Sequence, residues 1–243
     1  MCIRDRGAVV FLLGWFLRAP DSRFIAPAAV GQRRATVARE HTPMEMLKTP
    51  AFWVMYVLFV LTATGGLIAT AQLTPIANDF GLGNAPVTFL GMSTLALPFA
   101  LSLNRVLNGV SRPFFGWVSD HIGREKTMFY AFALEALVIL LLSQFGSNPL
   151  AFVILTALVF FAYGEIYSLF PATCADSYGK KFASANAGLL YTAKGAASLL
   201  VPLSSIIASG GGWRPVFIVA AAMNLLAAVA ALVVLRPLRA RLS

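Results

Sequence analysis

The sequence contains few charged residues, few cysteines and few histidines. Charged residues make up 12% of the 243 positions and hydrophobic residues 58%, whereas about a quarter of an ordinary soluble chain is charged. So few charges cannot cover a surface in water, which excludes a cytosolic enzyme of ordinary composition, a secreted disulfide scaffold and a disordered chain. Cys2, Cys174, His41 and His121 match no disulfide framework and no metal-ligand spacing. We therefore expect neither a metal nor a cofactor.

Long apolar runs dominate the sequence instead. They cover approximately residues 52–77, 88–112, 127–145, 150–172, 185–208 and 215–235. Each run is near the ~20 residues that a helix needs to cross a bilayer. The fold class we predict is an all-α membrane protein with six transmembrane helices.

A shorter apolar run, Gly7–Leu17, precedes these six. Its length also suits the core of a signal peptide, but the residues that follow, Arg18, Asp21 and Arg23, do not form a small-residue cleavage site. We therefore interpret residues 1–17 as the remnant of a preceding transmembrane helix.

The basic residues gather in alternate loops. They lie in 18–48, 116–126, 174–183 and the C-terminal segment, whereas the links near residues 79 and 147 contain none and the link at 209–214 contains only Arg214. This distribution follows the positive-inside rule and predicts that the C-terminus is cytoplasmic. Residues 18–48 form a cytoplasmic linker in this interpretation, and 49–243 form the six-helix bundle. The net charge of +9 then reflects topology and attraction to membrane lipid, with no nucleic acid as partner.

Within the linker, Thr42, Pro43 and Glu45 have the spacing of a helix start. Thr42 is the expected N-cap, Pro43 occupies the first helical position, and Glu45 closes a capping box. Because Pro50 follows soon after, we expect a short helix.

Some charged residues fall inside the predicted spans, where each costs at least ~2.5 kcal/mol unless it has a partner, a wet cavity or a function. They are Arg105, Arg112, Glu135, Glu165 and Lys194. Arg105 and Arg112 differ by only ~20° around a helix. Together with Asn104, Asn108 and Ser111 they make one polar stripe. We expect Arg112 and Lys194 to be functional. For Arg105, substrate binding and an ion pair with a carboxylate are equally favoured interpretations.

Aromatic residues accompany these charges. Tyr163 and Tyr167 share one helical face, and Tyr191 lies on the face of Lys194. Glu165 is ~200° around the helix from Tyr163, so we expect it to face a neighbouring helix and to neutralise Arg105. Glu135 has no polar stripe around it, and we interpret it as structural or partnered.

The segment 116–128 resembles the cytoplasmic loop signature of the major facilitator superfamily. Gly116, Asp120, Gly123 and Arg124 occupy its fixed positions. We expect Gly123 to permit the tight turn, Asp120 to bind amides at the start of the next helix and Arg124 to supply the counter-charge.

A closer resemblance, to the C-terminal half of the oxalate–formate antiporter family, covers nearly the whole chain. The matching pieces are Glu45–Trp53, Asn108–Gly116, Tyr167–Pro171 and Ala193–Lys194. The resemblance implies that the six spans are helices 7–12, that Arg112 and Lys194 bind the substrate carboxylate, and that Tyr163 and Tyr167 line the cavity. It also implies a partner, the N-terminal six-helix half. Arg105 and Glu165 depart from the pattern of this family, which has neutral residues there. The resemblance therefore implies a small carboxylate as substrate without specifying oxalate.

We therefore expect a secondary transporter that exchanges small carboxylate anions across the cytoplasmic membrane, because an anion neutralises two buried cations before the protein rocks between states. The substrate-binding residues we expect are Arg112, Lys194, Tyr163, Tyr167, Tyr191, Asn108 and Arg105. The main alternative is a proton-coupled monocarboxylate symporter in which Glu165 carries the proton. A non-transporting sensor or scaffold is a further alternative. We do not expect an enzyme, because the spans contain no Ser/His, Asp/Asp or HExxH arrangement.

Overall fold

The computed structural model describes residues 40–89 and 91–242. The predicted helix remnant at 1–17 and the linker up to residue 39 lie outside the described residues. The elements, in chain order, are α2 (Pro43–Leu47), α3 (Pro50–Asp79), β1 (Pro86–Phe89), β2 (Met92–Leu95), α4 (Ala96–Ile122), α5 (Arg124–Phe145), α6 (Pro149–Tyr163), α7 (Ile166–Tyr178), α8 (Ala183–Ser198), α9 (Val201–Gly211), α10 (Trp213–Ala230), the π-helical turn η1 (Ala231–Leu235) and α11 (Arg236–Ala240).

Helix starts follow the capping residues in the sequence. The capping box of α2 is confirmed, since Thr42 and Glu45 each bond the other's backbone amide. Asn148 caps α6 by accepting from the amides of Leu150 and Ala151 at 3.0 and 3.1 Å, with Pro149 at the first helical position. These side chains satisfy amides that the first turn leaves free.

The predicted span 88–112 is wrong at its start. β1 and β2 form an antiparallel hairpin in which Pro86 pairs with Leu95 and Val87 with Thr94, and α4 begins only at Ala96. Hydropathy alone does not distinguish a short apolar strand from a helix. Val87, Thr88 and Thr94 are β-branched and favour the strand.

Two predicted spans are each interrupted once. The fourth span divides into α6 and α7 around Gly164 and Glu165, and the fifth divides into α8 and α9 just before Pro202. A Cβ on Gly164 would collide with the hydroxyl of Ser111, so the glycine at the first break lets the chain lie against α4. At the second break, Pro202 cannot donate the amide that would continue α8.

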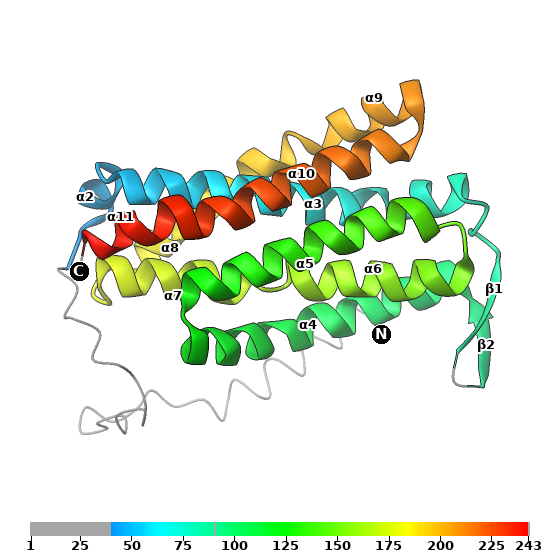
Figure 1. The fold of residues 1–243 in the computed structure, drawn as a ribbon, viewed down its shortest axis with the longest axis horizontal. Coiled ribbons are helices and arrows are strands. Elements are labelled where there is room, and N and C mark those ends of the chain that lie inside the picture. The colour runs from blue at the N-terminus through cyan, green and yellow to red at the C-terminus, as the bar shows by residue number, and fades with distance from the viewer. Residues whose placement is uncertain (1–39, 90, 243) are drawn as a thin grey trace, which may run out of the picture. The chain divides into compact units, whose positions relative to one another are not determined.

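Long helices lie side by side along the described part of the chain (Figure 1). α5 packs against α6 and α10, α4 packs against α6, and α3 packs against α8 and α10. Among the described residues, five stretches are able to cross a membrane by length and composition: Pro50–Asp79, Arg124–Phe145, Pro149–Tyr178, Ala183–Gly211 and Trp213–Ala240. α4 is not among them, because its polar stripe lowers its hydropathy. Its 27 residues nonetheless reach about 40 Å, which is enough to span a bilayer.

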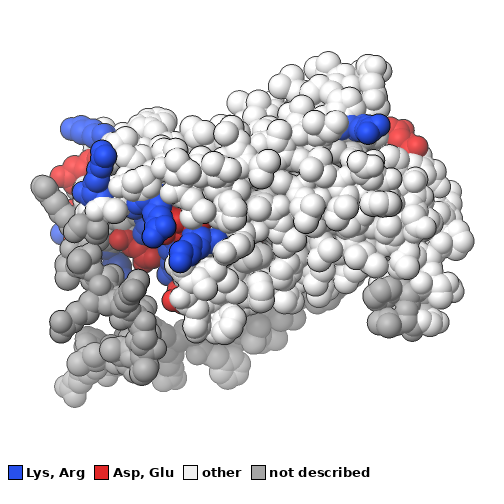
Figure 2. All heavy atoms as spheres, in the orientation of Figure 1, with Lys and Arg blue, Asp and Glu red and all other residues white. Residues whose placement is uncertain are grey.

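Charged side chains gather at one end of the helices, where the C-terminus lies (Figure 2). Arg124 pairs there with Asp120 and Asp176, and Arg239 pairs with Glu125. We refer to this as the charged end, and to the opposite end as the hairpin end.

The interior contains two apolar clusters, one toward each end. On α3 the first cluster reaches Ala63 and the second begins at Ile68, and on α5 the change falls between Phe132 and Ala136. A layer of buried polar side chains separates them. It includes Thr62, Thr64, Glu135, Glu165 and Asn224.

Candidate substrate-binding cavity

A cavity of about 260 Å³ opens between α3, α4, α6, α7 and α8. Its wall consists of Leu67, Thr70, Leu101, Asn104, Arg105, Asn108, Phe160, Tyr163, Tyr167 and Lys194. The described residues of this wall include two cations and no carboxylate. The cavity is therefore positively charged and suits an anion.

The polar stripe of α4 supplies one side of the cavity. Arg105 and Asn104 line it, and Arg105 makes no ion pair within residues 40–89 and 91–242. Asn104 is only 2% exposed, and neither atom of its amide has a hydrogen-bond partner among the described residues. A buried amide without partners is costly, so both side chains are available to a bound anion.

Tyr167 lies between two cations. The ammonium of Lys194 donates to its hydroxyl at 2.6 Å, and the guanidinium carbon of Arg112 lies 4.3 Å from its ring centre. Arg112 also donates to Oδ1 of Asn108 at 3.3 Å. Asn108 in turn donates to the carbonyl of Phe160 at 3.1 Å, which ties α4 to α6. Arg112 thus contacts two wall residues and is not itself part of the described wall.

Tyr163 forms the inner wall. It is 4% exposed, its ring packs edge-to-face on Tyr167 with centres 6.1 Å apart, and it fills the space beside Gly66, where any Cβ would collide with it. Gly66 therefore lets α3 approach α6 closely, whereas the adjacent Gly65 faces α5 and α10.

We expected Arg112 to bind the substrate directly, but it lies outside the described wall. Two further expectations for this site also differ from the structure. Tyr191 lies outside the cavity wall and packs against Phe59 of α3, with ring centres 5.4 Å apart, because this face of α8 is turned toward α3. Glu165 does not pair with Arg105. It is fully buried, and neither carboxylate oxygen has a hydrogen-bond partner among the described residues. The break after α6 directs Glu165 into the bundle, whereas Arg105 faces the cavity.

The predicted loop motif forms an ion network at the charged end. Gly123 has φ +97° and makes the turn between α4 and α5. Arg124 binds Asp120 at 2.8 Å, Asp176 of α7 at 2.9 Å, and the hydroxyl of Ser119. Asp120 therefore pairs with Arg124, whereas we expected it to bind helix-start amides. Gly116 lies in the last turns of α4, and its carbonyl accepts from Ser119 at 2.8 Å.

Sequence reasoning missed the wall residues Leu67, Thr70, Leu101 and Phe160, and it placed Asn104 in the polar stripe without assigning it to the site. Helical spacing from other residues points to two of them. Thr70 lies one turn after Gly66, and Phe160 lies one turn before Tyr163. This helical spacing was the signal that would have found them.

Comparison with known proteins places the chain in a family. The family model described as Major Facilitator Superfamily matches residues 7–202 and, in a second, overlapping match, residues 89–243. The chain belongs to the major facilitator superfamily. It is a multi-pass membrane protein of a transporter family and not an enzyme, as the sequence predicted.

Curated relatives agree with this assignment. The oxalate:formate antiporter of Oxalobacter formigenes is 32% identical over 91% of this chain and 50% of its own length. An uncharacterised 38 kDa protein of Thermoproteus tenax is 30% identical over 81% of the chain and 48% of its own length. An uncharacterised transporter of this superfamily from Escherichia coli is 24% identical over 67% of the chain and 38% of its own length. The chain thus spans about half the length, or less, of these relatives. The predicted resemblance to the oxalate–formate antiporter family is confirmed.

Proposed function

We propose that this chain is the C-terminal six-helix half of a secondary transporter that exchanges small carboxylates across the cytoplasmic membrane. The observation that carries this proposal is the convergence of Arg105, Arg112 and Lys194 around one cavity whose described wall contains no acidic residue. Its support is the similarity to the oxalate:formate antiporter.

The charges of the cavity explain why exchange is favoured over one-way movement. When the cavity is empty, like charges face each other at low dielectric, and closing the protein around them is unfavourable. A bound anion neutralises them and allows the closed state. If the protein returned to its first conformation without an anion, the cavity cations would repel each other at full strength. Each anion carried inward therefore requires another anion to be carried outward.

The residues of the cavity wall contribute to carboxylate binding in different ways. Lys194 offers a compact point charge, and Arg105 offers a planar fork that matches the two carboxylate oxygens. Asn104 adds donors that have no other described partner. Tyr163 and Tyr167 narrow the space and reduce its water content.

The charge distribution supports an orientation in the membrane. The basic residues of 174–183 and of the C-terminal segment lie at the charged end. By the positive-inside rule this end, with the C-terminus, faces the cytoplasm. The second six-helix half would then close the cavity from the opposite side, as in transporters built from two repeats.

The decisive experiment is a counterflow assay in lipid vesicles preloaded with unlabelled oxalate, formate or another small carboxylate. The chain is reconstituted alone and together with the N-terminal half of the antiporter relative. We expect labelled carboxylate to accumulate when both halves are present and the chain alone to give the empty-vesicle level. Absence of counterflow for every carboxylate with both halves would contradict carboxylate exchange.

A second candidate function, proton-coupled carboxylate uptake, is favoured by the burial of Glu165 without an ion-pair partner among the described residues. An imposed pH gradient separates the two functions. Symport predicts net uptake into vesicles without internal carboxylate when the outside is acidic. Obligate exchange predicts none.

A further inference from the structure

The polar layer between the two apolar clusters contains two carboxyl groups that the cavity does not use. Glu135 lies midway along α5, and Glu165 lies between α6 and α7. Both are 0% exposed, and none of their four oxygens has a hydrogen-bond partner in the described part of the chain. Glu135 meets α3 at Gly65, and Tyr163, two residues before Glu165, meets α3 at the adjacent Gly66, so the two carboxyl groups lie at one level of the bundle. Charged carboxylates at this level would repel each other. Two unpaired carboxylates are therefore not stable together at this depth.

Other buried polar groups face this pair. Asn224 of α10 lies beside Glu135, and its Oδ1 has no described partner. The side chains of Asn224 and Glu135 meet at Gly65, where a Cβ would be 2.9 Å from the amide nitrogen and 3.2 Å from the carboxyl oxygen. The glycine of α3 thus leaves room for both polar groups, and an alanine would displace them.

Tyr163 connects the pair to the anion cavity. It lines that cavity, while its buried hydroxyl has no described hydrogen-bond partner and interacts electrostatically with both Glu135 and Glu165. Tyr191 of α8 also interacts with Glu165. α3 and α10 contribute no ionisable side chain at this level among the described residues. The cations of α4 and α8 are engaged with Tyr167, Asn108 and the cavity.

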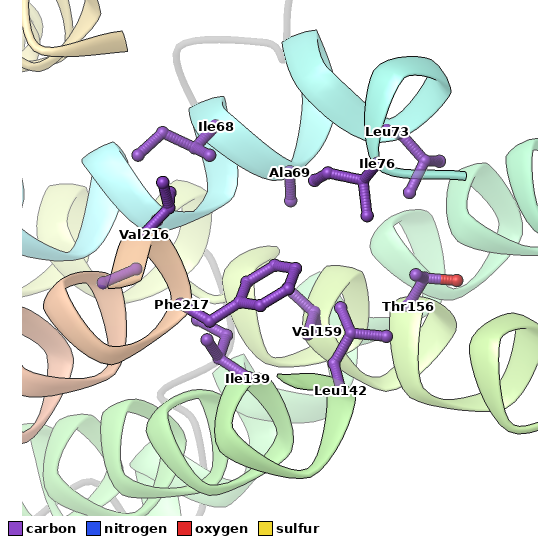
Figure 3. A pocket seen from close by; sticks show the side chains of 12 residues that line it. Ile68, Ala69, Leu73, Ile76, Ile139, Leu142, Thr156, Val159, Val216 and Phe217 are labelled. Carbon is purple, nitrogen blue, oxygen red and sulfur yellow. The ribbon is translucent and has the colours of Figure 1, made fainter. Parts of the chain in front are cut away.

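On the other side, toward the hairpin end, the pair is closed off by apolar packing. Gly65 also borders a pocket of about 20 Å³ between α3, α5, α6 and α10 (Figure 3). Its wall is almost entirely aliphatic and aromatic, with Ile68, Ile139, Val216 and Phe217 pointing into it. This volume holds at most about one water, and an apolar wall does not retain it. Among the described residues this apolar pocket offers no wet path for protons, whereas the cavity beside Tyr163 does offer polar surroundings.

We propose that Glu135 and Glu165 form a proton-binding pair whose protonation is linked, through Tyr163, to occupancy of the anion cavity. The pair holds at least one proton while the protein has the conformation described here. An anion that enters beside Tyr163 adds negative charge near the pair and favours retention of the proton. This inference rests on the proposed carboxylate transport for its second half, the linkage, but not for the protonation itself.

The test is infrared spectroscopy of the purified 243-residue chain in lipid, because protonated carboxyl groups absorb apart from carboxylates. We expect a protonated-carboxyl band that persists at neutral pH. Glu135→Gln and Glu165→Gln should each alter it, and the double variant should remove it. Glutamine has nearly the shape of a protonated glutamate, so these variants keep the packing. Glu45→Gln, at the exposed capping box of α2, is the matched control and should leave the band unchanged.

Several outcomes would overturn the proposal. A wild-type chain without the band at neutral pH shows that both carboxyls are ionised. If a sodium-dependent rise in melting temperature accompanies that result, the site binds a cation in place of a proton. A band that the double variant retains belongs to other residues.

The linkage has its own readouts. The pH at which the band disappears should shift when oxalate is added, and it should shift in Tyr163→Phe without any substrate. An unchanged titration in Tyr163→Phe overturns the linkage whatever the substrate is. A chain that binds no carboxylate but shows the band and the Tyr163→Phe shift contradicts the proposed function and leaves the proton pair supported.

Discussion

The ammonium of Lys194 lies 2.6 Å from the hydroxyl oxygen of Tyr167, so residues 27 positions apart on α8 and α7 form one contact in the cavity wall. The guanidinium of Arg112 covers the ring of the same tyrosine. One aromatic side chain therefore positions two cations, and both would respond to its loss.

The first prediction concerns these cations. Lys194→Ala removes a charge from the wall and should weaken carboxylate binding by roughly ten- to a hundredfold, since a hydrogen bond to a charged group contributes about 1.5–3 kcal/mol. Arg112→Lys should also weaken binding, because an ammonium group lacks the planar face that the guanidinium lays over the ring of Tyr167. Calorimetric titration with oxalate measures both effects. Lys126→Ala, an exposed lysine at the charged end, is the control. Normal transport by Lys194→Ala would refute the site.

The second prediction concerns selectivity. Arg105 lines the cavity without a described ion-pair partner, so it is free to hold the second carboxylate of a doubly charged substrate. Arg105→Gln should lower the affinity for a dicarboxylate at least tenfold more than for formate. Competition between unlabelled acids in the counterflow assay gives the ratio. Arg214→Gln, at the hairpin end, should leave the ratio unchanged. An equal loss for both acids would assign Arg105 a general electrostatic role.

The third prediction concerns packing around Tyr163. Gly66→Ala places a methyl group where the tyrosine ring now lies, and such overpacking costs about 1–3 kcal/mol. We expect a lower melting temperature in detergent. A Cβ on Gly109 of α4 meets no atom within 4 Å, so Gly109→Ala should be neutral or slightly stabilising. Equal melting temperatures for the two variants would show that α3 and α6 are not this close.

The fourth prediction concerns Glu165 and stability. An ion pair with Arg105 would make Glu165→Gln destabilising, because the arginine would lose its counter-charge. The structure shows no such pair among the described residues, so we expect the variant to melt at the same or a higher temperature. Thermal unfolding of the purified chain measures this. A melting temperature lower by many degrees would indicate that Glu165 and Arg105 do form an ion pair.

The fifth prediction concerns the ion network at the charged end. Arg124 joins the α4–α5 turn to Asp176 on α7, two residues beyond the buried thiol of Cys174. Arg124→Ala removes the contact between the α4–α5 turn and α7, so the thiol of Cys174 should become more accessible. We expect its alkylation rate to rise several-fold in a Cys2→Ser background. Arg241→Ala, near the C-terminus, is the control. An unchanged rate would mean that the network does not hold this end closed.

The sequence alone determined the class of protein and most of its helices. The scarcity of charge requires lipid contact, and runs of ~20 apolar residues form helices because a bilayer leaves no other partner for backbone groups. The loop motif around Gly123 and the cation positions Arg112 and Lys194 could also be found there, because fixed spacing places those residues on one turn or at one depth.

Only the tertiary structure decided which neighbours these residues meet. Helical periodicity places Arg105 and Arg112 on one face, but it does not say that Arg105 lines the cavity while Arg112 lies over Tyr167. Nor does it give the break at Gly164, where α6 lies against α4 and after which Glu165 is buried in the bundle. The hairpin at 86–95 depends likewise on pairing between two short segments. The physical reason is common to all three. A sequence sets the relative angle of side chains within one helix, whereas the direction in which that helix faces is fixed by close packing against others.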